Sequence, residues 1–158
     1  MSKNQSVDGL NPYIFDGSAM QIHPALFSHY FPLHPVFDKG VPGLKQFLLG
    51  GIGSGSMMHF HGSAVNLLLV GLKVWVLFPP THAFFARERA FDWFNVSYKR
   101  DFLDCSTSYT VTPTVDSSNK ACIPHISFLQ KAGDIVYIPE HWGHAVFNLA
   151  DSFALAIE

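Results

Sequence analysis

The chain has little cysteine and little charge, and both shortages restrict what kind of protein it is. Its 158 residues include only 2 cysteines, too few for the disulfide framework of a small secreted domain. Cys105 and Cys122 do not form a CxxC pair, so we expect two ordinary free thiols. Charged residues make up 14% of the chain and hydrophobic residues 48%, which excludes an intrinsically disordered protein and predicts a folded core.

Signals for membrane insertion and for nucleic-acid binding are also missing. The longest apolar run, residues 65–80, contains Lys73 and is interrupted by glycine and proline, so it is a poor candidate for crossing a bilayer. The formal net charge is -2 and no basic stripe alternates with aromatic residues, which argues against a nucleic-acid partner. Residues 1–6 lack the apolar centre of a signal peptide, so a cytoplasmic or nuclear location is the default expectation.

Aromatic residues, in contrast, are abundant. They make up 15% of the chain, with 15 phenylalanines among them. Such a chain must bury a large apolar interior or present an apolar surface to a partner. We therefore expect contact with another protein, and the composition is compatible with a homodimer.

Most of the chain is patterned as short strands, which predicts an all-β fold. Residues 1–12 are expected to form a flexible leader before one domain at 13–158. A short N-terminal helix is predicted at 18–30, and a second helix at 81–99 begins a variable insert of helix and loop that covers 81–124. Apolar runs bounded by turn residues predict strands at 47–49, 65–70, 74–78, 126–129, 134–138, 144–149 and 152–157. Many short strands at close spacing favour an antiparallel barrel, which binds ligands at one mouth.

Two histidines separated by one residue are the strongest chemical signal. A β-strand points residues i and i+2 to the same face, so His59 and His61 would face one spot if they are extended. The pair is expected at the start of a strand. A third histidine, His144, follows a strand that ends in proline. Three imidazoles in one place suit Fe(II), Zn(II) or another divalent metal ion.

Three blocks in a fixed order carry a family resemblance. They are GSGSMMHFHG at 53–62, NLLLVGLKVWVLFPP at 66–80 and AGDIVYIPEHWGHAVFNL at 132–149. Each block is weak by itself, but together they are specific. Across residues 44–158 the chain resembles the JmjC domain of the cupin superfamily, and it is most similar to the JmjC-domain-only subgroup that carries His-x-His-Gly.

The resemblance implies a double-stranded β-helix, the jelly-roll barrel of cupins. Most such domains bind Fe(II) and 2-oxoglutarate and oxidise a side chain of a protein or nucleic acid. The family's metal ligands fall on His59, His61 and His144, and no catalytic residue is implied beyond the metal centre. His141 remains the alternative third ligand.

Further residues match the family's co-substrate pocket. Lys73 stands where the family has the lysine that pairs with the distal carboxylate of 2-oxoglutarate, although a turn lysine in solvent is the plain alternative. Ser56 matches a position at which the family has a hydroxyl, and Asn66 and Asn148 match polar positions of the pocket. Buried asparagines that serve only the fold are the alternative for both. Trp75 and Trp142 are expected in the core or the pocket wall.

His61 departs from the family pattern because it stands where the acidic ligand is expected. Two histidines and one carboxylate are the ligand set of non-haem Fe(II) oxygenases. With a third imidazole the site carries +2 instead of +1, which favours a dianionic co-substrate but makes the metal less ready to activate O₂. Three hypotheses follow: an oxygenase of reduced activity, a non-catalytic metal-binding domain that contacts proteins, and a three-histidine cupin enzyme without 2-oxoglutarate.

Overall fold

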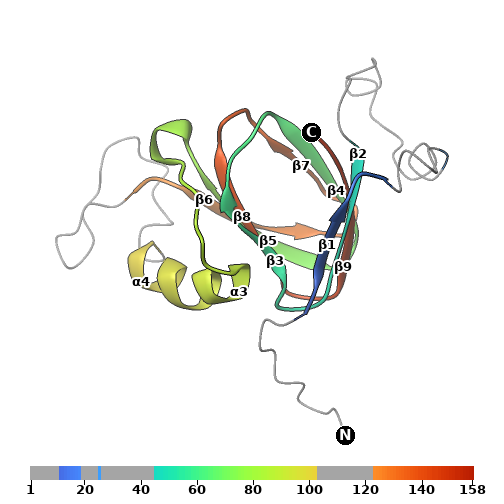
Figure 1. Cartoon of the computed structure of the whole chain (residues 1–158), viewed down its shortest axis with the longest axis horizontal. Helices are drawn as coiled ribbons and strands as arrows, with labels where there is room; N and C mark the ends of the chain where they lie inside the picture. Colours follow the sequence, from blue (N-terminus) through green and yellow to red (C-terminus); the bar gives the residue numbers. More distant parts are fainter. Residues whose placement is uncertain (1–10, 19–24, 26–44, 103–122) are drawn as a thin grey trace, which may run out of the picture.

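Two antiparallel sheets form the body of the protein. The computed structural model describes residues 11–18, 25, 45–102 and 123–158 (Figure 1). One sheet has five strands, in the order β1 (Tyr13–Asp16), β2 (Lys45–Gly50), β9 (Ser152–Ile157), β4 (Ala64–Val70) and β7 (Ile135–Ile138). The other has four strands, in the order β3 (Gly55–His59), β8 (Gly143–Asn148), β5 (Leu72–Phe78) and β6 (Ile126–Lys131).

Strands that are distant in sequence lie side by side in both sheets. β9 pairs with β2 and with β4, and β8 pairs with β3 and with β5. Figure 1 shows the two sheets facing each other around a shared interior, with the last strands of the chain at the centre of each sheet. The fold is therefore a jelly-roll barrel of the cupin type, and the predicted all-β class is confirmed.

The position of strand β5 in the fold explains why its sequence is apolar almost throughout. Trp75 and Leu77 point into the barrel and pack with Ala64, Val136 and Ile138, whereas the alternate residues point to the outer face. On that outer face Val76 and Phe78 pack against an aromatic cluster. Because both faces of β5 are covered, it lacks the polar alternation of a half-exposed strand.

A helical segment covers the outer face of the four-stranded sheet. It runs through α3 (Ala90–Asp92), the π-helical stretch η2 (Trp93–Ser97) and α4 (Tyr98–Asp101), and a single 3-10 turn, η1 (Pro80–His82), follows β5. Trp93, Phe94 and Tyr98 are buried against Phe78 and Met58.

The predicted helix at 81–99 is wrong in its first half, because the helix begins only at Ala90. Residues 83–89 run beside β3 instead, and the backbone N–H of Ala86 donates to the carbonyl of Met58 at 2.9 Å. The Phe84 ring packs against Phe78, with 5.6 Å between the ring centroids. The apolar spacing that indicated a helix therefore serves contact with the barrel wall, and tertiary packing overrides local propensity.

Two strands of the structure were not predicted from the sequence. Neither β1 nor β3 was expected, and β3 ends at His59, so the histidine pair lies at the end of a strand and does not start one. The predicted helix at 18–30, the leader at 1–12, the loop after residue 102 and both cysteines lie largely or wholly outside the described residues. None of the helices in the described part of the chain has the length and apolar character needed to cross a membrane.

Candidate metal centre

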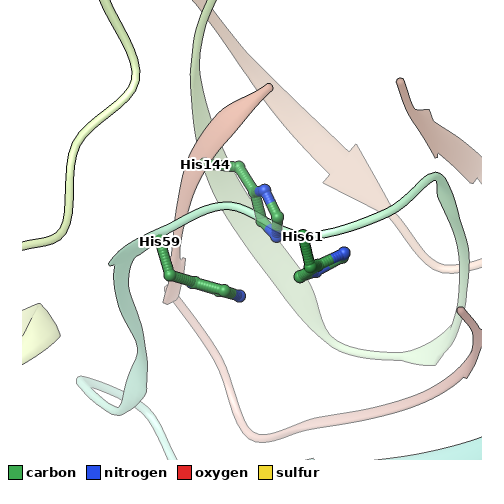
Figure 2. Close-up of side chains that lie close together, drawn as sticks. All are labelled: His59, His61 and His144. Atoms are coloured by element: carbon green, nitrogen blue, oxygen red, sulfur yellow. The ribbon is translucent and has the colours of Figure 1, made fainter. Parts of the chain in front are cut away.

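Three histidines from two distant parts of the chain meet inside the barrel. His59 ends β3, His61 lies two residues beyond it, and His144 lies in β8. One ring nitrogen of each histidine lies within 4.8 Å of those of the other two. Figure 2 shows the three side chains pointing into the same space, with ring centroids 4.2 Å apart for His59 and His144 and 4.7 Å apart for His61 and His144.

A β-bulge brings His59 into this group. Between β3 and β8, Ser56 pairs with Val146 and His59 pairs with His144. The pairing therefore advances three residues along β3 but only two along β8. The extra residue changes which face the side chains of β3 point to, so that Ser56 and His59 both line the interior although their positions differ by three, an odd number.

Backbone carbonyls determine which nitrogen of each ring carries the proton. Nδ1 of His59 lies 2.7 Å from the carbonyl of Met57, Nδ1 of His61 lies 2.8 Å from that of Gly62, and Nδ1 of His144 lies 3.0 Å from that of Trp142. A carbonyl oxygen only accepts hydrogen bonds, so Nδ1 must be the donor in each pair. In the neutral rings the lone pair is then on Nε2, which is the form in which imidazole binds a metal ion.

Burial keeps two of these rings neutral. Burial and the neighbouring His59 and His61 rings lower the pKa of His144 to about 3. Burial also lowers the pKa of His59 below its ordinary value, although the hydrogen bond to Met57 opposes this shift. At neutral pH both rings are therefore uncharged and present a lone pair to a cation.

The histidines line a cavity between the two sheets. The empty space that it encloses, including the open mouth, is about 480 Å³. The four-stranded sheet contributes Ser56, Trp75 and His144 to its wall, and the five-stranded sheet contributes Asn66. Ser56 and Asn66 therefore both line this cavity, while their role toward a co-substrate stays a prediction.

Lys73 is buried near the start of β5. It lies in β5, two residues before Trp75 and on the same face, with 1% of its surface exposed. The alternative of a solvent lysine is therefore wrong. Its Nζ lies 5.6 Å from the ring centroid of Tyr13, which lines the cavity, whereas Lys73 does not line it directly. Burial lowers the pKa of Lys73 to about 8.

Asn148 lies across the strand pair from Lys73 and is fully buried. Its Nδ2 donates to Ser54 Oγ at 3.1 Å, but its Oδ1 has no partner among the described residues. A buried cation beside an amide that is only partly satisfied is costly in an otherwise apolar interior. Such a combination is typical of a binding site.

Asn66 belongs to a buried polar network. Gln130 accepts a hydrogen bond from Nε1 of Trp75 at 2.8 Å and donates to Oδ1 of Asn66 at 3.2 Å. Trp75 also stacks near His144, with 6.1 Å between the ring centroids. The network therefore joins the wall of the cavity to one of the three histidines.

The remaining candidates lie elsewhere. His141 has a positive φ of 64°, its side chain is 65% exposed, and its ring faces Glu140 instead of the histidine group. Its backbone N–H donates to the carbonyl of His61 at 2.9 Å, which holds the two loops together. Trp142 packs at the edge of the inner core.

Sequence reasoning missed four residues of this region. Tyr13, Gln46 and Glu158 line the cavity, and Gln130 holds Trp75 and Asn66. Gln46 and Gln130 carried a signal, because each is a polar residue in an apolar strand and is no more than 3% exposed. Tyr13 and Glu158 carried none, because their positions depend on the pairing of β1 and β9 with distant strands.

Comparisons with known proteins find a family and several relatives. The model of the family described as "JmjC domain, hydroxylase" matches residues 53–158. JmjC domain-containing protein 8 of Homo sapiens is 28% identical over 143 residues, which cover 89% of this chain and 47% of that protein. Arginine-specific demethylase JMJ22 of Arabidopsis thaliana is 29% identical over 153 residues, which cover 90% of this chain and 30% of that protein. The chain thus spans about half the length or less of these relatives.

A solved structure supports the fold. The ribosomal oxygenase YcfD of Escherichia coli aligns with a TM-score of 0.54 at 13% identity, over 92% of this chain and 30% of that chain. At this level of identity the likeness concerns the barrel itself.

Proposed function

This chain belongs to the JmjC domain hydroxylase family, and we propose that it is an Fe(II)- and 2-oxoglutarate-dependent oxygenase that acts on a side chain of a protein. The family includes 2-oxoglutarate and iron-dependent oxygenases. One observation supports the proposal above all others: three imidazoles converge on one point, each with Nδ1 bonded to a carbonyl and with no hydrogen bond from Nε2 to any residue that the structure describes.

The donor set fits a divalent metal ion of the first transition row. Neutral imidazole suits iron, zinc and copper, and three such ligands leave coordination positions open for a co-substrate. His59, His61 and His144 would hold the ion. Bound there with 2-oxoglutarate, Fe(II) would support the reaction of O₂ in which 2-oxoglutarate becomes succinate and CO₂ and one oxygen atom enters a C–H bond of the substrate.

The buried Lys73 is the proposed partner of the distal carboxylate of 2-oxoglutarate. Lys73 is a buried cation, and burial alone accounts for the change in its pKa, with no described acidic group opposing it. An anion beside its Nζ would supply the missing charge partner. Ser56, Asn66 and Asn148 are proposed to bind the same molecule through their polar atoms. Tyr13 joins them, because its ring contacts Lys73 and lines the cavity.

The substrate class rests on the relatives. The demethylase of Arabidopsis thaliana is named as specific for arginine, a residue type found in proteins. In this proposal the side chains that line the cavity bind the metal and the co-substrate, the apolar wall around Trp75 excludes water, and the open mouth admits a protruding residue. A protein side chain is therefore the proposed substrate, with hydroxylation or demethylation as the outcome.

An anaerobic titration tests this function. Fe(II) and 2-oxoglutarate are added to the protein without oxygen, and the visible charge-transfer band of the complex is recorded before O₂ is admitted and CO₂ release is measured. The band and subsequent decarboxylation are expected. Lys73→Met should abolish the band without removing the metal, whereas Lys131→Met, at an exposed position of β6, should change neither. Metal binding without any band in the unmodified protein would contradict the proposal.

A second function is favoured by His61. An imidazole in place of the acidic ligand withdraws negative charge from the metal, so binding can persist while turnover falls. A band without decarboxylation would support a non-catalytic metal-binding domain that contacts proteins. Retained metal with no band would support a three-histidine enzyme that does not use 2-oxoglutarate, a hypothesis that leaves the buried Lys73 without a role.

A further inference from the structure

A carboxylate lies beside the histidine that replaces the family's acidic ligand. Glu158 directly follows β9, and its Oε1 lies 3.3 Å from Nδ1 of His61. Both residues line the same cavity, and their side chains are only 33% and 22% exposed. The pair joins the five-stranded sheet to the loop that follows β3.

The carboxylate approaches the side of the ring that faces away from the metal position. Nδ1 of His61 donates to the carbonyl of Gly62 at 2.8 Å, and Oε1 of Glu158 lies 3.3 Å from the same nitrogen. The three-histidine group in the described part of the chain does not include Glu158. Glu158 is therefore placed to act on the ring of His61 and not to coordinate an ion in its place.

Carboxylates in this position are known to tune metal sites in a general way. A histidine ligand that donates its second N–H to a carboxylate is held in one orientation and becomes a stronger electron donor. The negative charge also attracts the cation at short range in a partly buried site. Both effects strengthen metal binding.

Resting on the proposed metal function, we propose that Glu158 is a positioning residue for His61 that supplies, from outside the ligand set, the negative charge lost when an imidazole replaces the acidic ligand. His61 keeps the coordination position, and Glu158 returns the charge of the site from +2 to +1. The sequence separates the two residues by almost one hundred positions, and only the end of β9 brings them together.

Co(II) binding to the full chain tests this role, because its visible absorption reports both affinity and ligand set. Glu158→Gln keeps the size of the side chain and removes its charge. The dissociation constant for Co(II) should rise about tenfold or more, in the range of roughly 10–100-fold found for partners of metal ligands. The position and intensity of the absorption bands should stay the same, because the three imidazoles remain the ligands.

The chain offers a matched control. Glu140 and His141 also place a carboxylate oxygen and a ring nitrogen 3.3 Å apart, but their side chains are 67% and 65% exposed and outside the histidine group. Glu140→Gln removes the same charge at the barrel mouth and should leave Co(II) affinity within about twofold. The melting temperature of both metal-free variants should match that of the unmodified protein, which separates positioning from a general loss of fold.

The outcomes distinguish this role from the proposed function. Equal Co(II) affinity in Glu158→Gln and in the unmodified protein would overturn the role of Glu158 and leave the metal centre standing. A changed absorption spectrum in Glu158→Gln would show that Glu158 is itself a ligand and would likewise overturn it. If the unmodified protein binds no Co(II), both the metal centre and the role of Glu158 are wrong.

Discussion

His59 lies directly opposite His144 across the β3–β8 pair, and a bulge in β3 makes this pairing possible. The bulge places one extra residue between Ser56 and His59, so both residues face the interior. With regular alternation, one of the two side chains would point out of the barrel. The local irregularity of β3 is therefore a condition for the three-histidine group.

The close approach of β3 to β8 gives a first prediction. A Cβ added to Gly55 would lie 2.0 Å from the carbonyl oxygen of Val146. We expect Gly55→Ala to destabilise the protein by at least the roughly 1–3 kcal/mol of an overpacked site and to weaken metal binding, because β3 must shift. Denaturant unfolding and Co(II) titration measure both effects. Gly62→Ala is the control, since nothing lies within 4 Å of the added atom; equal behaviour of the two variants would refute the argument.

A second prediction concerns the choice between two nearby histidines. His144→Ala removes one of three converging ligands. It should lower Co(II) affinity by more than the roughly 100-fold loss caused by removing a hydrogen-bond partner of a metal ligand. His141→Ala removes an exposed ring and should leave affinity nearly unchanged. Isothermal titration checks the pair of variants. A larger loss in His141→Ala than in His144→Ala would show that His141, and not His144, is the third ligand.

The lowered pKa of Lys73 predicts an unusual dependence of stability on pH. Its pKa is about 8 in the folded protein against an ordinary 10.5, so the unfolded chain binds more protons between these values. Stability should therefore rise with pH above about 8. The full difference between the two pKa values of Lys73 corresponds to roughly 3 kcal/mol in the free energy of unfolding, at about 1.4 kcal/mol per pH unit. Burial raises the pKa of Tyr13 above its ordinary value, which lowers stability above about pH 10 and limits the window to about pH 8–10.

Urea unfolding at several pH values between 7.5 and 10 measures this slope. Lys73→Met should remove most of the rise and should be more stable than the unmodified protein at pH 7.5, because it no longer buries an unpaired charge. Lys131→Met, at the exposed end of β6, should keep the rise. A rise that survives in Lys73→Met would show that another group causes it.

The polar network around Gln130 gives a fourth prediction. Gln130→Leu would leave Nε1 of Trp75 without its acceptor and Oδ1 of Asn66 without its donor. Each buried group left unsatisfied costs about 1–3 kcal/mol. The free energy of unfolding should fall accordingly, as measured by denaturant titration. Ser127→Ala, at an exposed position of the same strand, should have almost no effect; an equal loss in both variants would contradict the network's importance.

Much of the barrel could be predicted from the sequence. The strands at 65–70, 74–78 and 152–157 were recognisable because apolar residues lie in short runs between turn residues, a pattern that needs no knowledge of the partner strand. The prediction of a helix at 81–99 was wrong in its first half, because the structure there depends on contacts with a distant part of the chain. Phe84 and Ala86 have helical spacing, yet the wall of the barrel binds them in an irregular segment.

The sequence by itself determined the chemistry available to this protein: a His-x-His pair, a third histidine in a later block, and a lysine within an apolar strand. These features are properties of residue type and short spacing, which the chain carries before it folds. Only the tertiary structure decided that His59 faces His144, that Lys73 is buried beside Tyr13, and that Glu158 reaches His61. Each of these contacts depends on strand register between segments far apart in the chain, and a shift of one residue would turn the side chains to the other face.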